Sequence, residues 1–296
     1  MKVFDWKEFS GGAFLDFAAG QRSALTVGVF DGLHRGHAAL LQAIRERNEL
    51  IPLVITCRRN PKEFLKKSAF TGDILSLSRK LELFDEAGAA AAVLIDFSAR
   101  FSTMAGKDFL TLLLKWGNPA YAAVGSNFHC GHRMDTGAAE TRAFFAASGV
   151  HVTVVESVRR GEDRVSSSRI RAAIRAGNVA QAAEMLGRPV EIDLPVGTRH
   201  YDGREYVRFR MRGRVLPPGG TWPVLVRRNG LPPARAEARI ADGEIALFFD
   251  AGVGVKNGRA VVPGGMIGND TPDTVWRVEF SGPEDDTGGN CVPQGE

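Results

Sequence analysis

Apolar runs alternate with amphipathic stretches through the first half of the chain. Ile51–Cys57 is continuously apolar and rich in β-branched residues, as expected of a strand buried on both faces. Similar runs predict further strands at 89–95, 120–124 and His151–Val155, and helical spacing predicts helices at 75–86, 107–116 and 138–147. This alternation predicts a doubly wound α/β fold, a parallel sheet with helices on both faces that binds ligands outside the carboxyl ends of its strands.

A strand, a tight turn and a helix start follow one another in residues 26–37, TVGVFDGLHRGH. The apolar residues up to Phe30 predict the end of the strand, and Asp31 and Gly32 predict the turn. After Gly36, apolar residues recur at helical spacing until a charged run ends the pattern. The first strand of the fold therefore leads into a helix through a glycine-containing turn.

His34 and His37 lie where this turn passes into the helix. A helix start offers unpaired backbone N–H groups and the positive end of its dipole, so two imidazole donors there suit a polyphosphate. Gly28 and Gly32 would let backbone or ligand approach where a Cβ would collide. Histidines in a loop are often merely exposed, but the strand, turn and helix start supply the context that such a motif needs.

Two later segments carry polar groups where a ligand site of this fold would need them. VGSNFHCGHRMDTG, residues 124–137, is a strand end and a glycine-rich loop in which Asn127 either offers a donor and an acceptor to a ligand or closes a turn. VSSSRIRAAIRAGNVAQAAEMLGRP, residues 165–189, places three serines before a helix, where one can cap it and others can bind an anion. Arg171 adds a planar cationic donor suited to phosphate, although solvated arginines after a serine cap are common.

The pattern changes after Pro189. Alternating arginines indicate a half-buried strand: Arg208, Arg210, Arg212 and Arg214. Short runs at 222–226 and 245–249 then alternate with turns, which predicts a small antiparallel barrel or sandwich; the turns are Pro217-Pro218-Gly219-Gly220, Asn229-Gly230, Asp242-Gly243 and Asn257-Gly258. At the two ends, residues 1–23 predict a partly packed arm and residues 281–296 a disordered tail.

Composition is ordinary for a globular chain of about two domains: 296 residues, 44% hydrophobic and 24% charged. No run approaches the roughly 18 apolar residues of a membrane span, and the first residues lack the build of a signal peptide, so we expect a cytoplasmic protein with no membrane partner. The net charge of +4 lies in the first two thirds without a nucleic-acid-binding motif, so no nucleic-acid partner is expected. Cys57, Cys130 and Cys291 predict plain thiols, and His129-Cys130-Gly131-His132 alone is a weak metal signal.

GVFDGLHRGH, residues 28–37, resembles the signature of the nucleotidylyltransferase superfamily, whose His-x-Gly-His follows the first strand of a doubly wound domain. The fuller Gly-x-Phe-Asp-Gly-x-His-x-Gly-His form is similar to the FMN adenylyltransferase module of bacterial FAD synthetases. The serine run resembles the second superfamily signature, Ser-Ser-Thr-x-x-Arg, with Ser168 in place of threonine. Residues 124–137 resemble the segment that lines the flavin side of the FAD synthetase pocket.

This resemblance implies transfer of AMP from ATP to FMN, giving FAD and pyrophosphate. It implies catalytic roles for His34, His37 and Arg171. Contacts with ATP are expected at Gly28, Phe30, Asp31, Gly32, His34, His37, Ser166, Ser167 and Arg171. Contacts with FMN are expected at Pro61, Gly125, Asn127 and Phe128. Mg²⁺ is expected to be carried by ATP, with Asn127 as the only candidate ligand from the protein.

The chain departs from the family pattern in two places. After the second predicted strand the family carries Phe-x-Pro-His-Pro, where this chain reads TCRRNPKEFL; Pro61 and Phe64 look retained, and Arg58 and Arg59 could meet the FMN phosphate. The Gly-x-Pro-Thr-x-Asn element of the riboflavin kinase domain, a small β-barrel that usually follows, is not found in the last third. We therefore expect an FMN adenylyltransferase domain at 1–188, a barrel without kinase activity at 189–280 and the tail at 281–296.

Three alternatives stay open at this point. The enzyme could keep riboflavin kinase activity and be bifunctional, or it could adenylate a different phosphorylated acceptor. The chain could also be a non-catalytic module that binds flavin or nucleotide, which the altered segment after the second strand makes plausible. Asn127 in its glycine loop favours FMN as the acceptor, and a monomer is the default expectation for the oligomeric state.

Overall fold

The computed structural model describes residues 1–65, 70–195, 198–201, 205–228, 231–249, 254–256, 259–262, 265–266 and 276–280. The chain divides into two compact units, Met1–Ile170 with Gly213–Val215 and Arg171–Arg212 with Leu216–Glu296. The expected functional domains, 1–188 and 189–280, stay a prediction, and the expected tail lies outside the described residues.

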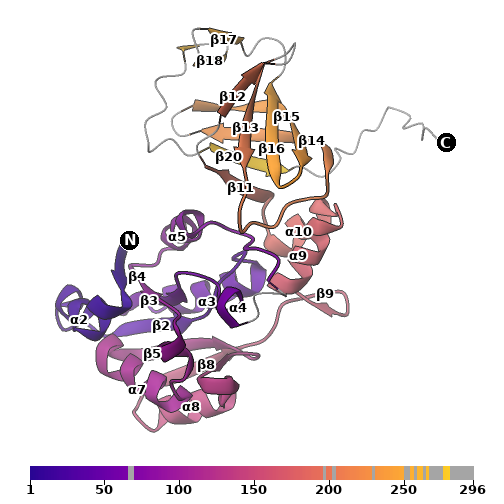
Figure 1. The fold of residues 1–296 in the computed structure, drawn as a ribbon. Helices are drawn as coiled ribbons and strands as arrows, with labels where there is room; N and C mark the ends of the chain where they lie inside the picture. Colours follow the sequence, from indigo (N-terminus) through magenta and orange to yellow (C-terminus); the bar gives the residue numbers. More distant parts are fainter. Residues whose placement is uncertain are drawn as a thin grey trace. The chain divides into compact units, whose positions relative to one another are not determined.

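The first unit is built on a parallel sheet with strand order β1-β4-β3-β2-β5-β8 (Figure 1). These strands are β1 (Lys2–Asp5), β2 (Ser23–Val27), β3 (Ile51–Cys57), β4 (Ala91–Ile95), β5 (Pro119–Gly125) and β8 (His151–Val155). From β2 the chain adds β3 and β4 on one side and later β5 and β8 on the other, so the strand order reverses beside β2. In doubly wound sheets such a reversal opens a crevice outside the carboxyl ends, where ligands bind.

Both faces of this sheet are buried because its strands send alternate side chains into two cores. One core holds Leu25 and Leu53 and is covered by α1 (Trp6–Ser10), α2 (Ala13–Ala18), α7 (Gly106–Gly117) and α8 (Ala138–Ala146). The other holds Ala24 and Val54 and is covered by α3 (Arg35–Arg45) and α5 (Leu77–Glu86). The doubly wound α/β fold predicted from the alternating apolar runs is confirmed.

Shorter elements join these layers. They are α4 (Pro61–Leu65), α6 (Ala99–Ser102), β6 (His129–Cys130), the 3-10 turn His132–Met134, β7 (Thr136–Gly137), β9 (Arg159–Arg160) and β10 (Asp163–Arg164). Helix α9 (Ser167–Arg175) follows, and the division between the two units falls within it. None of the helices in the described part of the chain is long and apolar enough to cross a membrane.

The N-terminal segment is part of the core, so the expectation of a partly packed arm was wrong. β1 pairs with β4 at the edge of the sheet, and Phe9 and Phe14 are fully buried against it. A capping box starts α1, because the Asp5 side chain accepts from the Glu8 N–H and the Glu8 side chain accepts from the Asp5 N–H, each at 2.8 Å. Elements of four to six residues are too short for periodicity to reveal which apolar side chains face the core.

The second unit contains an antiparallel sheet, curled as a half-barrel, with the order β11-β20-β14-β15-β16-β13-β12 among the described strands (Figure 1). After α10 (Val179–Leu186) come β11 (Val190–Leu194), β12 (Thr198–Tyr201), β13 (Glu205–Arg210), β14 (Gly220–Arg228), β15 (Leu231–Ala241), β16 (Glu244–Phe249) and β20 (Trp276–Phe280). Short strands β17 (Gly254–Lys256), β18 (Arg259–Val262) and β19 (Gly265–Met266) form a separate small sheet. The predicted second antiparallel domain is confirmed.

Two of the predicted glycine turns, Pro217–Gly220 and Asp242-Gly243, lie within the described residues, and the first of them leads into β14 at Gly220. Asp242 and Gly243 both have positive φ, 49° and 74°, and join β15 to β16, as in the two-residue hairpins that favour Asp-Gly. The predicted turns at Asn229-Gly230 and Asn257-Gly258 lie outside the described residues.

The alternating arginines form a shorter strand than predicted. Arg208 and Arg210 point to Glu244 on the neighbouring strand, at 3.6 and 3.2 Å, while Phe209 between them is buried. The strand ends at Arg210, and Arg214 belongs to the first unit. The strand ends where its backbone pairing with β16 ends, at the pair of Arg210 and Glu244. Alternation of side chains carries no information about backbone pairing.

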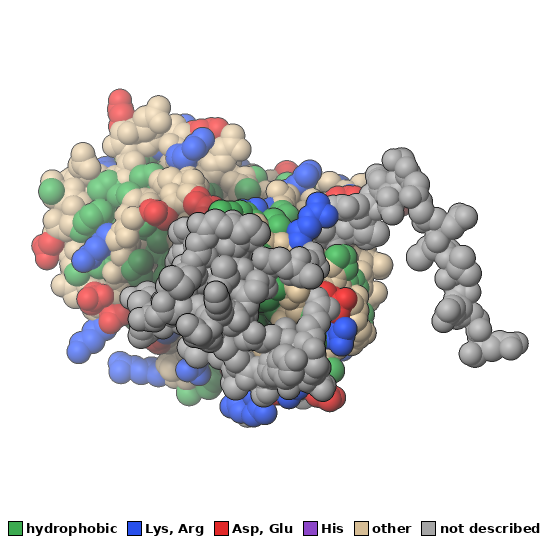
Figure 2. All heavy atoms as spheres, turned by 90° about the horizontal axis from the view of Figure 1, so that it is seen from above, with side chains coloured by type: hydrophobic (Ala, Val, Ile, Leu, Met, Phe, Trp, Pro, Cys, Tyr) green, Lys and Arg blue, Asp and Glu red, His purple; other side chains and the backbone are tan. Residues whose placement is uncertain are grey.

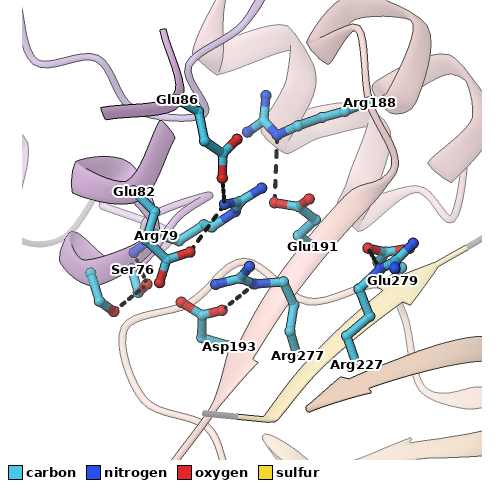
Figure 3. A network of polar contacts seen from close by, with 11 residues as sticks. Ser76, Arg79, Glu82, Glu86, Arg188, Glu191, Asp193, Arg227, Arg277 and Glu279 are labelled. Carbon is cyan, nitrogen blue, oxygen red and sulfur yellow. Dashed lines mark hydrogen bonds and ion pairs between the residues drawn. The ribbon is translucent and has the colours of Figure 1, made fainter. Parts of the chain in front are cut away.

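On one face of the molecule the charged side chains of the described residues are dispersed. Over the face shown in Figure 2, Lys and Arg are scattered with Asp and Glu between them. In the second unit, Arg277 donates to Asp193 at 2.7 Å and Arg227 pairs with Glu279, both across neighbouring strands (Figure 3). Many of the arginines that make the chain basic thus have carboxylate partners.

The burial of the N-terminal segment predicts a large effect of one substitution. Phe9→Ala should lower the free energy of unfolding by about 3–5 kcal/mol, because it removes a fully buried ring and leaves a cavity. Phe17→Ala is the control, since this ring is 44% exposed, and should cost about 1 kcal/mol or less. Urea denaturation measures both, and equal losses would contradict the assignment of Phe9 to the core.

Candidate functional site

The turn after β2 has a strained backbone. Phe30, Gly32 and Leu33 have φ values of 52°, 83° and 38°, and the left-handed region is rare for residues other than glycine. Phe30 is fully buried and Leu33 is 7% exposed, both in the core under α3 and α5. Strain of this kind persists only where packing imposes it, and it clusters at functional sites. β2 ends at Val27 rather than at Phe30, the end that the sequence predicted.

His34 and His37 lie together at the start of α3. His34 is the N-cap residue of this helix, and its side chain accepts from the His37 N–H through Nδ1 at 3.4 Å. The two rings are stacked, with centroids 3.7 Å apart and planes 15° from parallel, and the His37 ring meets the Phe30 ring edge-on at 5.1 Å. The predicted pair is therefore assembled at the N-terminus of a helix.

The glycine between these histidines is explained by ring packing. A Cβ on Gly36 would lie 3.2 Å from Cε1 and 3.3 Å from Nδ1 of His34, tighter than ordinary contacts. A Cβ on Gly28 would likewise lie 3.1 Å from the Phe30 ring. Both glycines therefore serve the close packing of a neighbouring ring. The contact with ATP that was predicted for Gly28 stays a prediction.

Asp31 ties this turn to two distant segments. Its carboxylate is buried, and Oδ1 accepts from the N–H of Ile74 at 2.9 Å and of Leu75 at 3.5 Å. Its backbone carbonyl accepts from the Ser167 hydroxyl at 2.7 Å, across 136 positions of the chain. The two segments that the sequence singled out separately, the histidine turn and the serine run, thus meet. The predicted contact of Asp31 with ATP stays a prediction.

The three serines before α9 have different partners. The Ser166 hydroxyl accepts from the Arg169 N–H at 3.4 Å, the bond of a helix cap, while its own O–H is not used by that bond. Ser167 donates to Asp31, and the Ser168 hydroxyl lies 3.5 Å from the Lys62 ammonium. The capping role that the sequence allowed for one serine therefore belongs to Ser166.

Arg171 lies one turn after Ser167 on α9 and is 7% exposed. Residues four apart lie on the same face of a helix. Arg171 and Ser167 therefore share one face of α9. The division between the two units falls between Ile170 and Arg171. The predicted contact of Arg171 with the ATP phosphates stays a prediction.

The predicted flavin side includes a turn at the end of β5. The Phe128 N–H donates to the Gly125 carbonyl at 2.9 Å, so Asn127 lies within this turn with an exposed side chain. A Cβ on Gly125 would lie 3.1 Å from Asn127 Oδ1, and the partly buried Phe128 packs against the core. Asn127 thus occupies a turn position and also offers its amide to solvent.

The altered segment after β3 is internally bonded. Pro61 is the first residue of α4, where its missing N–H costs nothing. Asn60 is buried; its Nδ2 donates to Asp73 at 2.9 Å and its Oδ1 accepts from the Lys62 N–H at 3.1 Å. Arg58, which the sequence offered to the FMN phosphate, pairs with Asp96 at 2.8 Å.

Aromatic surface lies close to this segment. Phe64 on α4 is 52% exposed and meets the Phe97 ring at 6.0 Å, edge to face. Phe97 follows the end of β4 and Pro61 follows the end of β3. The carboxyl edge of the sheet therefore presents exposed ring area beside these two strands.

A buried lysine that the sequence did not single out joins two of the strand ends. Lys80 Nζ donates to the Cys57 carbonyl at 2.8 Å and to the Val29 carbonyl and the Thr56 hydroxyl at 3.3 Å each. Three acceptors match the three protons of an ammonium group. Burial lowers the pKa of Lys80, and the nearby Cys57 and Asp31 oppose that shift.

The sequence does carry a signal for this lysine. Lys80 lies three residues before Leu83 and four before Phe84, both buried, so it occupies the apolar face of α5. A lysine at such a position is rarely buried without partners. Helical periodicity applied to charged as well as apolar residues would have found it.

The remaining polar candidates are not arranged as a metal centre. In the described part of the chain, no three His, Cys, Asp or Glu side chains come together as metal ligands. His129 Nδ1 lies 3.1 Å from the Asn127 carbonyl and His132 Nδ1 lies 3.0 Å from the Ser102 carbonyl. Cys57 and Cys130 are free thiols; burial raises the pKa of Cys57 to about 11 and that of Cys130 to about 12.

Lys80→Met should lower the free energy of unfolding by about 1–3 kcal/mol, because buried oxygens then lose a charged donor. Lys107→Met on the exposed start of α7 is the control and should change it by less than about 0.5 kcal/mol. Urea denaturation of both variants provides the measurement. A Lys80→Met protein as stable as the wild type would show that the ammonium contributes no net stability.

Known proteins resemble this chain over most of its length. The sequence model of the FAD synthetase family matches residues 17–169. The bifunctional riboflavin kinase/FMN adenylyltransferase of Escherichia coli (strain K12) is 29% identical over 224 residues, which cover 73% of this chain and 72% of that protein. The FAD synthetase of Listeria monocytogenes is 29% identical over 204 residues, which cover 68% of this chain and 80% of that protein.

A crystal structure of a macrolide-efflux protein from Streptococcus pneumoniae shares the fold. The TM-score is 0.75 over 95% of this chain and 90% of that one, with 21% sequence identity, so this likeness speaks for the fold alone. The family match spans the doubly wound sheet from β2 to β8 and reaches the start of α9, so it includes both the histidine turn and the serine run that bonds to it. The chain therefore belongs to the FAD synthetase family.

Proposed function

We propose that this protein transfers AMP from ATP to FMN, giving FAD and pyrophosphate. The observation that carries the proposal is the bond between Ser167 and Asp31. It brings the serine run to the turn that holds His34 and His37, beside the point where the strand order of a FAD synthetase sheet reverses. Membership of this family supports both the reaction and its substrates.

The chemistry needs alignment more than proton transfer. The FMN phosphate is already an anion, so the attack on the α-phosphorus of ATP requires a fixed geometry and neutralisation of the charge that develops on pyrophosphate. His34 and His37 would donate to the ATP phosphates at the N-terminus of α3. Ser166, Ser167 and Arg171 would hold the departing oxygens.

The acceptor would lie at the ends of β3, β4 and β5. Asn127 offers an exposed amide there, and Phe128, Gly125 and Pro61 would frame the flavin as the family resemblance implies. The exposed Phe64 ring beside Phe97 is suited to the flat apolar face of an isoalloxazine.

Mg²⁺ would enter as the partner of ATP. ATP oxygens would supply most of its ligands, as is usual where the protein offers few carboxylates. Asn127 is the side chain we propose as an additional oxygen ligand, because it lies exposed at the end of β5. The metal would neutralise charge on the leaving pyrophosphate.

We further propose that the second unit lacks riboflavin kinase activity. The sequence lacks the Gly-x-Pro-Thr-x-Asn element of that activity. Relatives of this chain carry both names, bifunctional enzyme and FAD synthetase, so a bifunctional enzyme is the second candidate. The cytoplasmic location and the monomeric state expected from the sequence stay predictions.

His37→Ala should lower kcat for FAD formation by at least about tenfold, because it removes a donor to a charged phosphate. His151→Ala is the matched control: this imidazole is exposed on β8 and stacks on Tyr121. Initial rates of pyrophosphate release with ATP and FMN would be compared at equal folded fractions. If His37→Ala kept the wild-type rate, the proposed role of this side chain would be wrong.

The acceptor can be identified in one assay. Incubation of the protein with ATP, Mg²⁺ and either FMN or riboflavin, followed by chromatographic separation of the flavins, should give FAD from FMN and no FMN from riboflavin. FMN formed from riboflavin would establish the bifunctional alternative. Flavin binding without release of pyrophosphate would instead favour a non-catalytic module.

A further inference from the structure

Three residues from between β13 and β14 belong to the first unit. Gly213–Val215 packs there although the chain on either side belongs to the second unit. The Asp73 N–H donates to the Gly213 carbonyl at 2.8 Å, and the Val215 N–H donates to the Asp73 carbonyl at 3.1 Å. Asp73 and Arg214 therefore pair as neighbours in a parallel bridge, and Val215 is buried.

The fit between the two segments is close enough to require glycine at one position. Gly72 has a φ of 103°, and a Cβ there would lie 2.6 Å from the carbonyl carbon of Arg214 and 2.9 Å from its oxygen. The Arg214 guanidinium donates to the Leu75 carbonyl. Residues 213–215 thus bind residues 72–75 by both backbone and side chain.

Residues 72–75 in turn hold both sides of the candidate site. The N–H groups of Ile74 and Leu75 donate to the buried carboxylate of Asp31, in the turn that carries the histidines. The Asp73 carboxylate accepts from Asn60, in the altered segment on the flavin side. A displacement of residues 72–75 would therefore shift Asp31 on the nucleotide side and Asn60 on the flavin side together.

We propose that Gly213–Val215 is a brace for the adenylyl-transfer site and that Arg214 is a positioning residue for its reaction. The brace fixes residues 72–75, and these fix Asp31 and Asn60. This inference rests on the proposed function, and it gives the last third of the chain a role in the reaction that requires no kinase activity. The segment acts on catalysis without touching either substrate.

Arg214→Ala in the full-length protein tests the side-chain part of the brace. We expect kcat for FAD formation to fall by about 10- to 100-fold, with KM for ATP and FMN changed less, because misplaced catalytic groups affect the transition state most. Arg212→Ala, an exposed arginine two residues earlier, is the control and should keep the wild-type kcat. Arg214→Lys, which keeps a cationic donor, should restore part of the loss.

Gly72→Ala tests the backbone part independently. The substitution adds left-handed backbone strain and a clash with the Arg214 backbone. Gly20→Ala is the control, because Gly20 has a φ of 87° and nothing lies within 4 Å of the added Cβ, so this variant adds the strain without a clash. Hydrogen–deuterium exchange should become at least about tenfold faster at residues 28–34 and 72–76 in Gly72→Ala and Arg214→Ala, and stay unchanged there in Gly20→Ala.

Both measurements are made well below the melting temperature of each variant, so that global unfolding contributes to neither. Unchanged kcat in Arg214→Ala and Gly72→Ala would overturn the proposal, whatever the exchange shows. If the wild-type protein forms no FAD, the proposed function fails; unchanged exchange at residues 28–34 would then overturn the brace, and faster exchange there would support it.

Discussion

The turn between β2 and α3 is the constraint on which the rest of the site depends. Its backbone takes left-handed angles at Phe30 and Leu33, and such residues cost on the order of 1–3 kcal/mol each. Burial of both side chains and the bonds to Asp31 offset that cost. Because the turn is held in this form, α3 begins with two stacked imidazoles at its N-terminus.

The second requirement is that neighbouring strand ends keep a fixed separation. Lys80 meets it by donating from one ammonium group to oxygens at the ends of β2 and β3. Its three bonds compensate for the cost of burying a charge. Nucleotide and flavin contacts, which we place at different strand ends, can be aligned only if those ends do not move relative to each other.

The two strongest departures from the family pattern have different structural meanings. Asn60, in the segment after β3, is buried and bonded to Asp73, so the altered chemistry there has become part of the scaffold. The last third keeps an ordered antiparallel sheet with paired charges across its strands. Gly213–Val215, which belongs to the first unit, is held to residues 72–75 by backbone bonds and by the Arg214 side chain.

By itself the sequence determined the local order of the fold. Strands β3 and β8 begin and end where predicted. For β3 the reason is its burial, since a strand buried on both faces is a continuous apolar run. β8 lies at the edge of the sheet and is only partly buried, but its β-branched residues still marked its bounds. The sequence also determined which turn carries the histidines. Only the tertiary structure decided that β1 closes the sheet, that Ser167 bonds to Asp31, and that Lys80 joins two strands. Such contacts link residues far apart in the chain: Ser167 and Asp31 are 136 positions apart, and Arg214 and Leu75, which also bond, are 139 positions apart. A single bond between distant segments leaves no periodic pattern in either of them, so the sequence does not reveal it.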